Sequence, residues 1–480
     1  MTRVRLACAL VAALVAGCSA EEDGARPHVL VVVVDTLRAD ALGVYGSSVG
    51  DSPELDAFAE TASVYSRAST PRAKTNPAVA SLMTGTYPPE HGVRDLSTPL
   101  PVDLPTLAES FRDAGYRTVG IVGNYVLGAE RSGLDRGFDR WIEEWPDVGD
   151  RSAPATSVPE RRAPSLTDAA VEALSLAEAG PLFLYLHYMD PHGPYDPPEE
   201  HRVEAAAPRP IEVPEAPNRW RPFSLAEKNV PEHAYLDDGR IDASVVRALY
   251  RGEVRTVDRE LGRLFRELES RGLRENTVVV VTADHGESLG EHDYWFEHGK
   301  HAYEATTWVP LMIAGPLKLD PTRLDANVSL VDVAPTLRAE LLGAELPNTD
   351  DPRGASLGPA GSGSLSPVYS EKAEGNDQSR TMQIDAVRHG RWKLVRRFTT
   401  IDPGAAQKRP ILADELYDLE TDRLEQVDLS QAEGAQLPGL IQELMRWRAF
   451  DDAHEDAPER PFTSEELEHL RAMGYLGDAR

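Results

Sequence analysis

Short apolar runs recur along the chain and predict buried β-strands. They span residues 29–34, 119–122, 182–186, 278–281 and 309–313. Valine dominates several of them, which is typical of strands covered on both faces of a sheet. Between the runs lie helical patterns, of which the longest covers residues 242–271 and has an apolar residue every three or four positions. Alternating strands and helices predict an α/β fold with a doubly wound, largely parallel sheet.

A second, smaller region follows this pattern. Residues 351–367 are rich in Gly, Ser and Pro and predict a linker. The domain before it would span 28–350, and a C-terminal α+β subdomain would span 368–480. Within that subdomain the patterns predict a hairpin at 385–395, a strand at 415–419 and a helix at 437–448.

The first residues have the features of an export signal. Residues 1–17 combine an early basic pair with an apolar run at 6–16 that is too short to span a bilayer. The run ends in Leu-Val-Ala-Gly-Cys, which resembles the lipobox of a bacterial lipoprotein. We therefore expect lipidation of Cys18, a tether at 18–27, and membrane attachment through the lipid alone, facing the periplasm or the cell exterior. The alternative is a secretory signal cut near Ala20.

Charge and cysteine content narrow the function. The formal net charge of −29 argues against nucleic-acid binding, which needs a basic surface. A small anionic substrate would need local cations or a metal ion to be captured. The two cysteines, Cys8 and Cys18, leave the mature chain without a disulfide pair. Nothing in the composition sets the oligomeric state.

Chemically active residues follow the predicted strands. Asp35 ends the first run, and Asp284 and His285 follow the fourth; His187 and His192 follow the run at 182–186. The carboxyl ends of parallel strands meet at one edge, where ligands bind in open α/β sheets. Two carboxylates and an imidazole there predict one divalent metal ion, with Mn, Ca, Mg and Zn all compatible.

Thr75 lies at the cap of a predicted helix that runs through Leu82. Free backbone N–H groups and the helix dipole at that position favour an anion. A nearby metal would turn the weakly nucleophilic hydroxyl into an alkoxide. Each residue alone also has a simpler explanation: Thr75 as a helix cap, Asp35 as a turn residue and His285 as a hydrogen-bonded histidine.

Several motifs, in order along residues 28–429, resemble the sulfatase family of the alkaline phosphatase superfamily. The segment from Thr75 to Gly85 resembles that family's C-x-P-S-R-A-S-L-L-T-G, whose Cys becomes a formylglycine. The other matching segments are 31–40, 52–56, 82–88, 91–93, 250–262, 282–287, 303–304 with 309–311, 392–394 and 415–418. The resemblance implies an alkaline-phosphatase-like fold with a smaller C-terminal subdomain.

The resemblance also implies roles for individual residues. Asp35, Asp284 and His285 would bind the metal together with Thr75, which would be the nucleophile. His192 matches the family's substrate-side histidine. The positions that would contact the substrate or its leaving group are His298, Lys300, Arg38 and Asn124.

Four departures limit what the resemblance implies. Thr75 replaces Cys, so the formylglycine route is absent. Val79 replaces an Arg, Asn124 replaces a Lys, and Thr36 replaces a second Asp. The favoured interpretation is a metal-dependent hydrolase of phosphate, phosphonate or sulfate esters.

In that reaction Thr75 attacks, and one of His192, His187 and His298 protonates the leaving group. Phosphorus is favoured over sulfur because a sulfo-threonine lacks the exit that formylglycine provides. Two alternatives are an inactive lipoprotein that binds an anionic ligand and a phospho-group transferase.

Overall fold

A computed structural model describes most of the chain. The described residues are 26–144, 161–212, 224–319, 321–345, 357, 366–372, 383–398, 411–454, 458, 460–464 and 467. The expected signal peptide, Cys18 and most of the tether fall outside them, as does most of the linker expected at 351–367. Among the described residues, no helix is both long and apolar enough to cross a membrane.

An eight-stranded sheet forms the centre, in the order β11-β2-β10-β7-β1-β5-β3-β4. Only β10 runs antiparallel to its neighbours, so the predicted doubly wound, largely parallel sheet is confirmed. The five predicted strands are β1, β3, β5, β7 and β10. The bounds are β1 His28–Val34, β2 Ser63–Ser69, β3 Arg117–Val122, β4 Arg140–Ile142, β5 Leu182–Tyr188, β7 Thr277–Ala283, β10 Leu311–Ala314 and β11 Arg323–Ser329.

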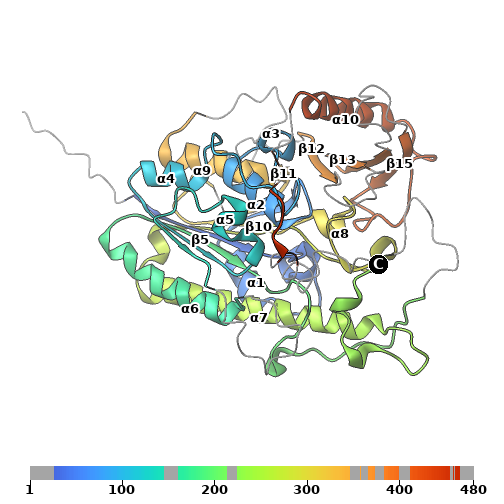
Figure 1. The fold of residues 1–480 in the computed structure, drawn as a ribbon, viewed down its shortest axis with the longest axis horizontal. Helices are drawn as coiled ribbons and strands as arrows, with labels where there is room; N and C mark the ends of the chain where they lie inside the picture. The colour runs from blue at the N-terminus through green and yellow to red at the C-terminus, as the bar shows by residue number, and fades with distance from the viewer. Residues whose placement is uncertain are drawn as a thin grey trace, which may run out of the picture.

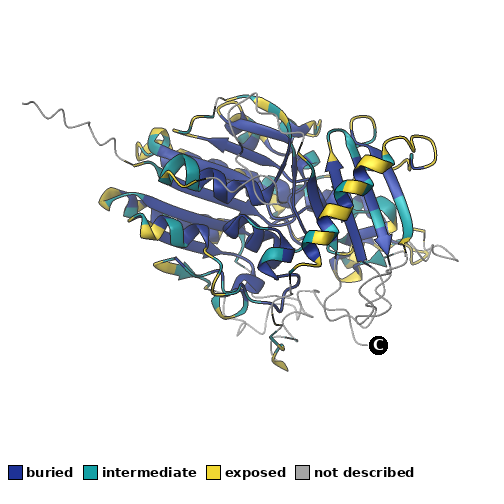
Figure 2. Ribbon diagram, turned by 90° about the horizontal axis from the view of Figure 1, so that it is seen from above, coloured by how far each residue is buried: buried dark blue, intermediate teal, exposed yellow. Residues whose placement is uncertain are grey.

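Helices cover both faces of this sheet (Figure 1). On one face lie α6 (Ala163–Ala173) and α7 (Ala243–Ser270), and on the other lie α2 (Thr75–Thr84), α4 (Leu107–Asp113) and α9 (Val333–Leu342). The strands between them are almost wholly buried (Figure 2). The shorter helices are α1 Pro53–Ala59, α3 Pro88–His91, α5 Ala129–Ser132 and α8 Glu304–Thr307.

The C-terminal subdomain is a separate antiparallel sheet, β12-β13-β14-β15, packed against α10 (Leu437–Asp451). Its strands are β12 Val368–Lys372, β13 Gln383–His389, β14 Trp392–Phe398 and β15 Ile411–Asp418. The predicted hairpin is therefore β13 and β14. Trp447 of α10 contacts Tyr369 and also Tyr87, so one apolar cluster joins the two regions.

The Pro- and Glu-rich loop formed by residues 191–212 and 224–235 is anchored by a three-stranded sheet. Its strand β6 (Ser224–Leu225) pairs with β9 (Tyr294–Glu297), which also pairs with β8 (Ser288–Leu289). The chain leaves β9 directly into His298. The loop is thereby fixed beside the segment that follows β7.

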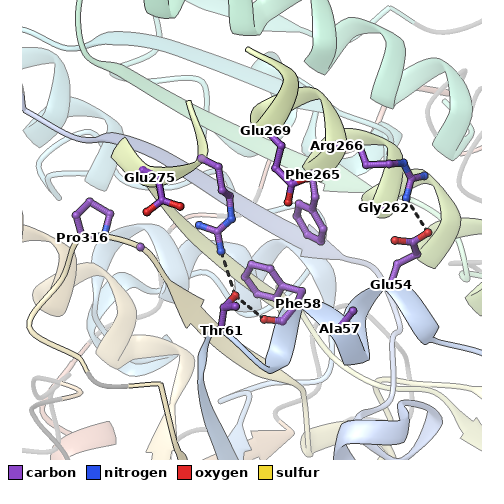
Figure 3. A pocket seen from close by; sticks show the side chains of 12 residues that line it. Glu54, Ala57, Phe58, Thr61, Gly262, Phe265, Arg266, Glu269, Glu275 and Pro316 are labelled. Atoms are coloured by element: carbon purple, nitrogen blue, oxygen red, sulfur yellow. Dashed lines mark hydrogen bonds and ion pairs between the residues drawn. The ribbon is translucent and has the colours of Figure 1, made fainter. Parts of the chain in front are cut away.

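A pocket lies at the edge of the main sheet where β7 begins (Figure 3). Its lining includes the stacked rings of Phe58 and Phe265 and the ion pair between Glu54 and Arg266. Residues before β7 and after β10 complete it. Because β7 ends at the opposite edge, this pocket is remote from the residues that sequence analysis selected.

Candidate active site

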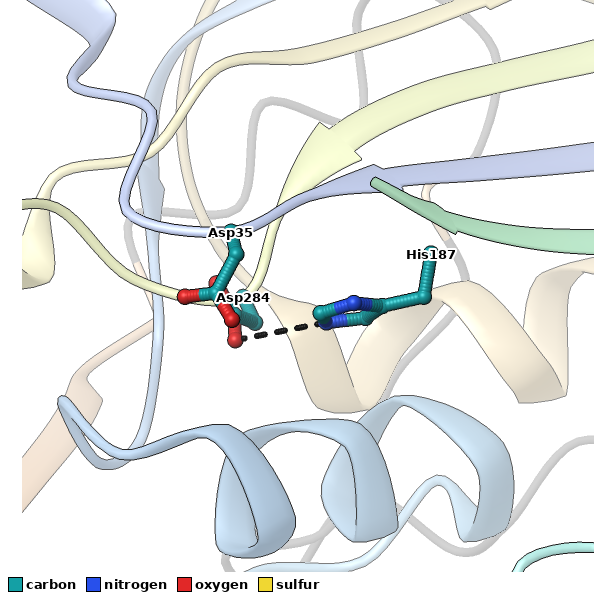
Figure 4. Close-up of side chains that lie close together, drawn as sticks. All are labelled: Asp35, His187 and Asp284. Atoms are coloured by element: carbon teal, nitrogen blue, oxygen red, sulfur yellow. Dashed lines mark ion pairs between the residues drawn. The ribbon is translucent and has the colours of Figure 1, made fainter. Parts of the chain in front are cut away.

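Three predicted residues meet where β1, β5 and β7 end. These strands are adjacent, and Val34 of β1 pairs with both Tyr188 of β5 and Ala283 of β7. That register brings Asp35, His187 and Asp284 to one rim, as Figure 4 shows. Each offers a ligand atom within 4.8 Å of the others, and all three are buried.

Local backbone geometry orients Asp284. Its Oδ1 accepts the backbone N–H of His285 at 2.7 Å and that of Thr36 at 3.3 Å. Thr36 adopts a φ of 55°, which is unusual for a β-branched residue, and its hydroxyl donates to the carbonyl of Asp35. Oδ2 of Asp284 therefore faces the imidazoles. Burial opposes its ionisation, but His285 and His187 hold the pKa of Asp284 at about 2.

His285 is arranged to present a ring lone pair. Its Nδ1 donates to the Gly286 carbonyl at 3.0 Å, so Nε2 is the acceptor atom of the neutral ring. Nε2 lies 3.5 Å from Asp284 Oδ2 and 3.7 Å from Asp35 Oδ1. It has no hydrogen-bond partner among the described residues. A carbonyl that fixes one ring nitrogen while the other faces carboxylates is the pattern of a metal-binding histidine.

His187 belongs to the same group. Its Nε2 lies 3.5 Å from Asp284 Oδ2, and neither ring nitrogen makes a hydrogen bond within the part of the chain that the structure describes. Sequence analysis predicted that His187 acts on the leaving group. Its position also places it among oxygen and nitrogen donors of the kind that suits a divalent metal, so both roles stay predictions.

Thr75 is the first residue of α2, and Lys74 is the N-cap. The prediction of Thr75 at the cap is therefore off by one position. Thr75 is fully buried, and its hydroxyl has no hydrogen-bond partner among the described residues. A buried hydroxyl without a partner is costly for stability, so its retention points to a ligand or a reaction.

Two further histidines stand beside this group. The ring centroid of His298 lies 4.3 Å from that of His285 and 5.1 Å from that of His192. Nδ1 of His298 is 3.2 Å from Glu287 Oε1, and Nδ1 of His192 donates to the Gly193 carbonyl. Burial lowers the pKa of both rings well below its usual value, and it raises the pKa of Glu287 to about 8.

Each of the three side chains expected to contact the substrate anion is bonded to a carboxylate of this chain. Asn124 donates to Asp35 Oδ2 at 2.6 Å, so it orients a carboxylate. Arg38 is held by Asp40 and Glu291, two carboxylates near it in the fold. Lys300 is half-exposed and pairs with Glu297 at 2.8 Å. In this arrangement none of the three directs a free charge to the rim.

Sequence analysis missed two lysines that flank the histidines. Lys228, in the anchored loop, acts electrostatically on both His192 and His298. Lys74 precedes Thr75, and it makes no hydrogen bond or ion pair through its side chain with any described residue. Burial and Arg72 lower the pKa of Lys74 to about 8, which leaves it mostly protonated at neutral pH. In the sequence, the position of Lys74 directly before Thr75 was the one sign that it lies near the site.

Comparison with known proteins agrees with this geometry. The family profile described as Sulfatase matches residues 27–344, more than half of the chain. The chain belongs to the sulfatase family, and it is thus a hydrolase of sulfate or phosphate esters.

Choline-sulfatase of Rhizobium meliloti (strain 1021) is 26% identical over 466 residues, covering 85% of this chain and 83% of that protein. The multifunctional alkaline phosphatase superfamily protein PehA of Trinickia caryophylli is 27% identical over 399 residues. The match covers 68% of this chain and 76% of PehA.

Solved structures show the same fold. The phosphonate monoester hydrolase of Agrobacterium radiobacter superimposes with a TM-score of 0.67 at 22% identity, covering 89% of this chain and 96% of that one. The corresponding enzyme of Silicibacter pomeroyi gives a TM-score of 0.67 at 24% identity, with coverage of 90% and 96%. The expected alkaline-phosphatase-like architecture with its separate C-terminal sheet is confirmed.

Proposed function

We propose that this protein hydrolyses phosphate or phosphonate esters, and less readily sulfate esters, with Thr75 as nucleophile. The observation that carries the proposal is the buried hydroxyl of Thr75, which has no partner among the described residues. It stands next to Lys74, whose side chain packs on Gly299, and His298 beside Gly299 contacts His285. These contacts run from Thr75 through Lys74, Gly299 and His298 to His285 at the rim.

The donor set fits one divalent cation. Asp35, Asp284 and His285 would hold it with Thr75, and His187 is a further candidate ligand. When bound, such a cation supplies positive charge beside the Thr75 hydroxyl and the substrate oxygens. Asn124 orients Asp35, while two backbone N–H groups orient Asp284.

The residues then divide one difficult displacement into two steps. The Thr75 oxygen bonds to the phosphorus as the bond to the leaving alcohol breaks, and the proton lost by Thr75 is balanced by the one the alcohol gains. His192 or His298 relays that proton; in His192, whose Nδ1–H donates to Gly193, Nε2 takes up the proton that Thr75 loses and then passes it to the oxygen of the departing alcohol. Water then attacks phosphorus, which frees the acid and restores the Thr75 hydroxyl.

The nucleophile supports phosphorus over sulfur. A phospho-threonine can be cleaved by water attacking phosphorus, whereas a sulfo-threonine has no counterpart of the formylglycine exit. The relatives named above include a sulfatase and a multifunctional superfamily member, so both ester classes belong in a test.

Turnover of aryl phosphate, bis-p-nitrophenyl phosphate, phenylphosphonate and aryl sulfate should be measured with Mn, Ca, Mg and Zn in turn. We expect Thr75→Ala to reduce the best activity by about a thousandfold or more, since the nucleophile is lost. Thr75→Ser should retain much of it. Metal content, measured on each variant, controls for a damaged site.

Three results would redirect the proposal. Full activity in Thr75→Ala excludes Thr75 as nucleophile. A parent protein without metal and without turnover supports the inactive, ligand-binding alternative, which the missing cations at Val79 and Asn124 favour. Transfer of the phospho-group to added glycerol in preference to water supports the transferase.

We further propose that the protein is exported and lipidated at Cys18. Support comes from the basic start and the short apolar run that ends at Cys18. Mass spectrometry of the mature N-terminus in the native host tests this, since a start at Ser19 or beyond excludes lipidation of Cys18.

A further inference from the structure

We propose that Lys74 binds the non-bridging oxygens of the substrate anion and so replaces the cations that this chain lacks. The inference rests on the proposed function, because it assigns a binding role at that same site. It concerns substrates with a tetrahedral anionic group, of which inorganic phosphate is the simplest. It names a residue that the family motif does not include.

The first support is the path of the Lys74 side chain. A Cβ built on Gly299 would lie 3.2 Å from Lys74 Cε and 3.3 Å from its Cγ. The alkyl chain of Lys74 therefore runs along the Gly299 backbone, whose φ of +86° suits glycine. That backbone adjoins His298, whose ring contacts the ring of His285. The side chain thus extends toward the histidines.

The second support is that Lys74 has charge available. Its neighbours Arg72 and Arg94 both pair with the buried Glu371, at 3.1 Å and 2.5 Å. The ammonium group of Lys74 makes no such bond within the described residues, and Asp95, which attracts it electrostatically, already accepts hydrogen bonds from Ser97 and Thr98. It is half-buried, so an anion that it binds is partly shielded from water.

The third support is the shortage of other cations. Val79 and Asn124 stand where the family pattern has Arg and Lys, while Arg38 and Lys300 are paired with carboxylates. The whole protein carries a net charge of −29, which repels an anionic substrate. Lys74, the N-cap of α2, lies beside the first N–H groups of that helix and adds a full charge to them.

Lys74→Met should be compared with Lys74→Arg and with Lys318→Met in the full chain. Lys318 is exposed and follows β10 at the opposite edge, so it provides the same change of charge far from the site. Binding of inorganic phosphate should be measured by calorimetry on metal-loaded protein. We expect Lys74→Met to weaken it about tenfold to a hundredfold, the effect of losing one charge-assisted hydrogen bond.

Lys74→Arg should recover part of the affinity, and Lys318→Met should match the parent. Phosphate binding within twofold of the parent in Lys74→Met, at equal metal content, overturns the inference. So does a metal-loaded parent that binds neither phosphate nor sulfate. A parent that binds phosphate through Lys74 but turns over no ester refutes the proposed hydrolysis and leaves Lys74 as the anion contact.

Discussion

The strand-end rim and the junction with the C-terminal subdomain both bury charged groups, but they treat them differently. At the junction, Glu304 accepts from Lys393 at 2.9 Å and from Arg388 at 3.0 Å. At the rim, imidazoles face the carboxylates of Asp35 and Asp284, and the amide of Asn124 donates to Asp35. The carboxylate of Glu304 is thus paired with two cations of this chain, whereas the rim carboxylates face imidazole nitrogens that have no hydrogen-bond partner among the described residues.

This difference distinguishes charged side chains that are buried to hold the fold from those that are buried to bind a ligand. Burying a charge is expensive unless an opposite charge or a metal compensates it. The junction meets that cost with its own side chains and gains a fixed orientation of the two sheets. At the rim the free-energy cost of burying the carboxylates remains, and the binding of a cation and an anion would remove it.

Breaking the junction should give the largest effect on stability. Glu304→Ala leaves the buried Arg388 without its carboxylate and leaves Lys393 with Glu425 alone, so we expect a loss of about 3–5 kcal/mol in unfolding free energy. Denaturant titration of the full chain measures it. The exposed Glu433→Ala is the matched control and should change stability by less than about 0.5 kcal/mol. Equal effects of the two substitutions would show that the junction is not held by this group.

A smaller effect should follow at the rim from His187→Ala. If His187 is a ligand, metal affinity should fall about tenfold to a hundredfold, as measured by competition with a chromophoric chelator. The exposed His233→Ala serves as control. Unchanged metal affinity with a reduced kcat would instead restore His187 to the leaving-group role predicted from sequence.

Expressed per pH unit, the smallest effect concerns the pH dependence of stability at the junction. Burial raises the pKa of Asp385 to about 7, against the opposing charge of Arg448. A carboxyl whose pKa is higher in the folded state stabilises the fold at low pH, and this contribution is lost between about pH 4 and pH 7.

Asp385→Asn should remove that slope, which is at most about 1.4 kcal/mol per pH unit for one proton. Unfolding free energies of parent and variant, measured across this range, test it. Parallel curves would show that Asp385 is ionised throughout.

Sequence patterns predicted which residues meet at the rim, but they did not predict which carboxylates bind the polar side chains around it. Valine-rich β1 and β7 were recognisable, and their parallel alignment placed Asp35 and Asp284 together. The polar strands β2 and β11 and the three-residue β4 lack such a signal. Arg38, Asn124 and Lys300 were assigned by motif position, yet each is held by a carboxylate whose approach depends on local folding.

The pairing of β6 with β9 has a consequence for how this site can diversify. Lys228 follows β6, and β9 leads into His298, so this short pairing joins a segment from between β5 and α7 to the part of the chain that follows β7. Within that segment residues 204–208 are exposed, and they can change in composition while β1, β5 and β7 stay in register. The outer surface can therefore diverge while the strand-end rim keeps its geometry.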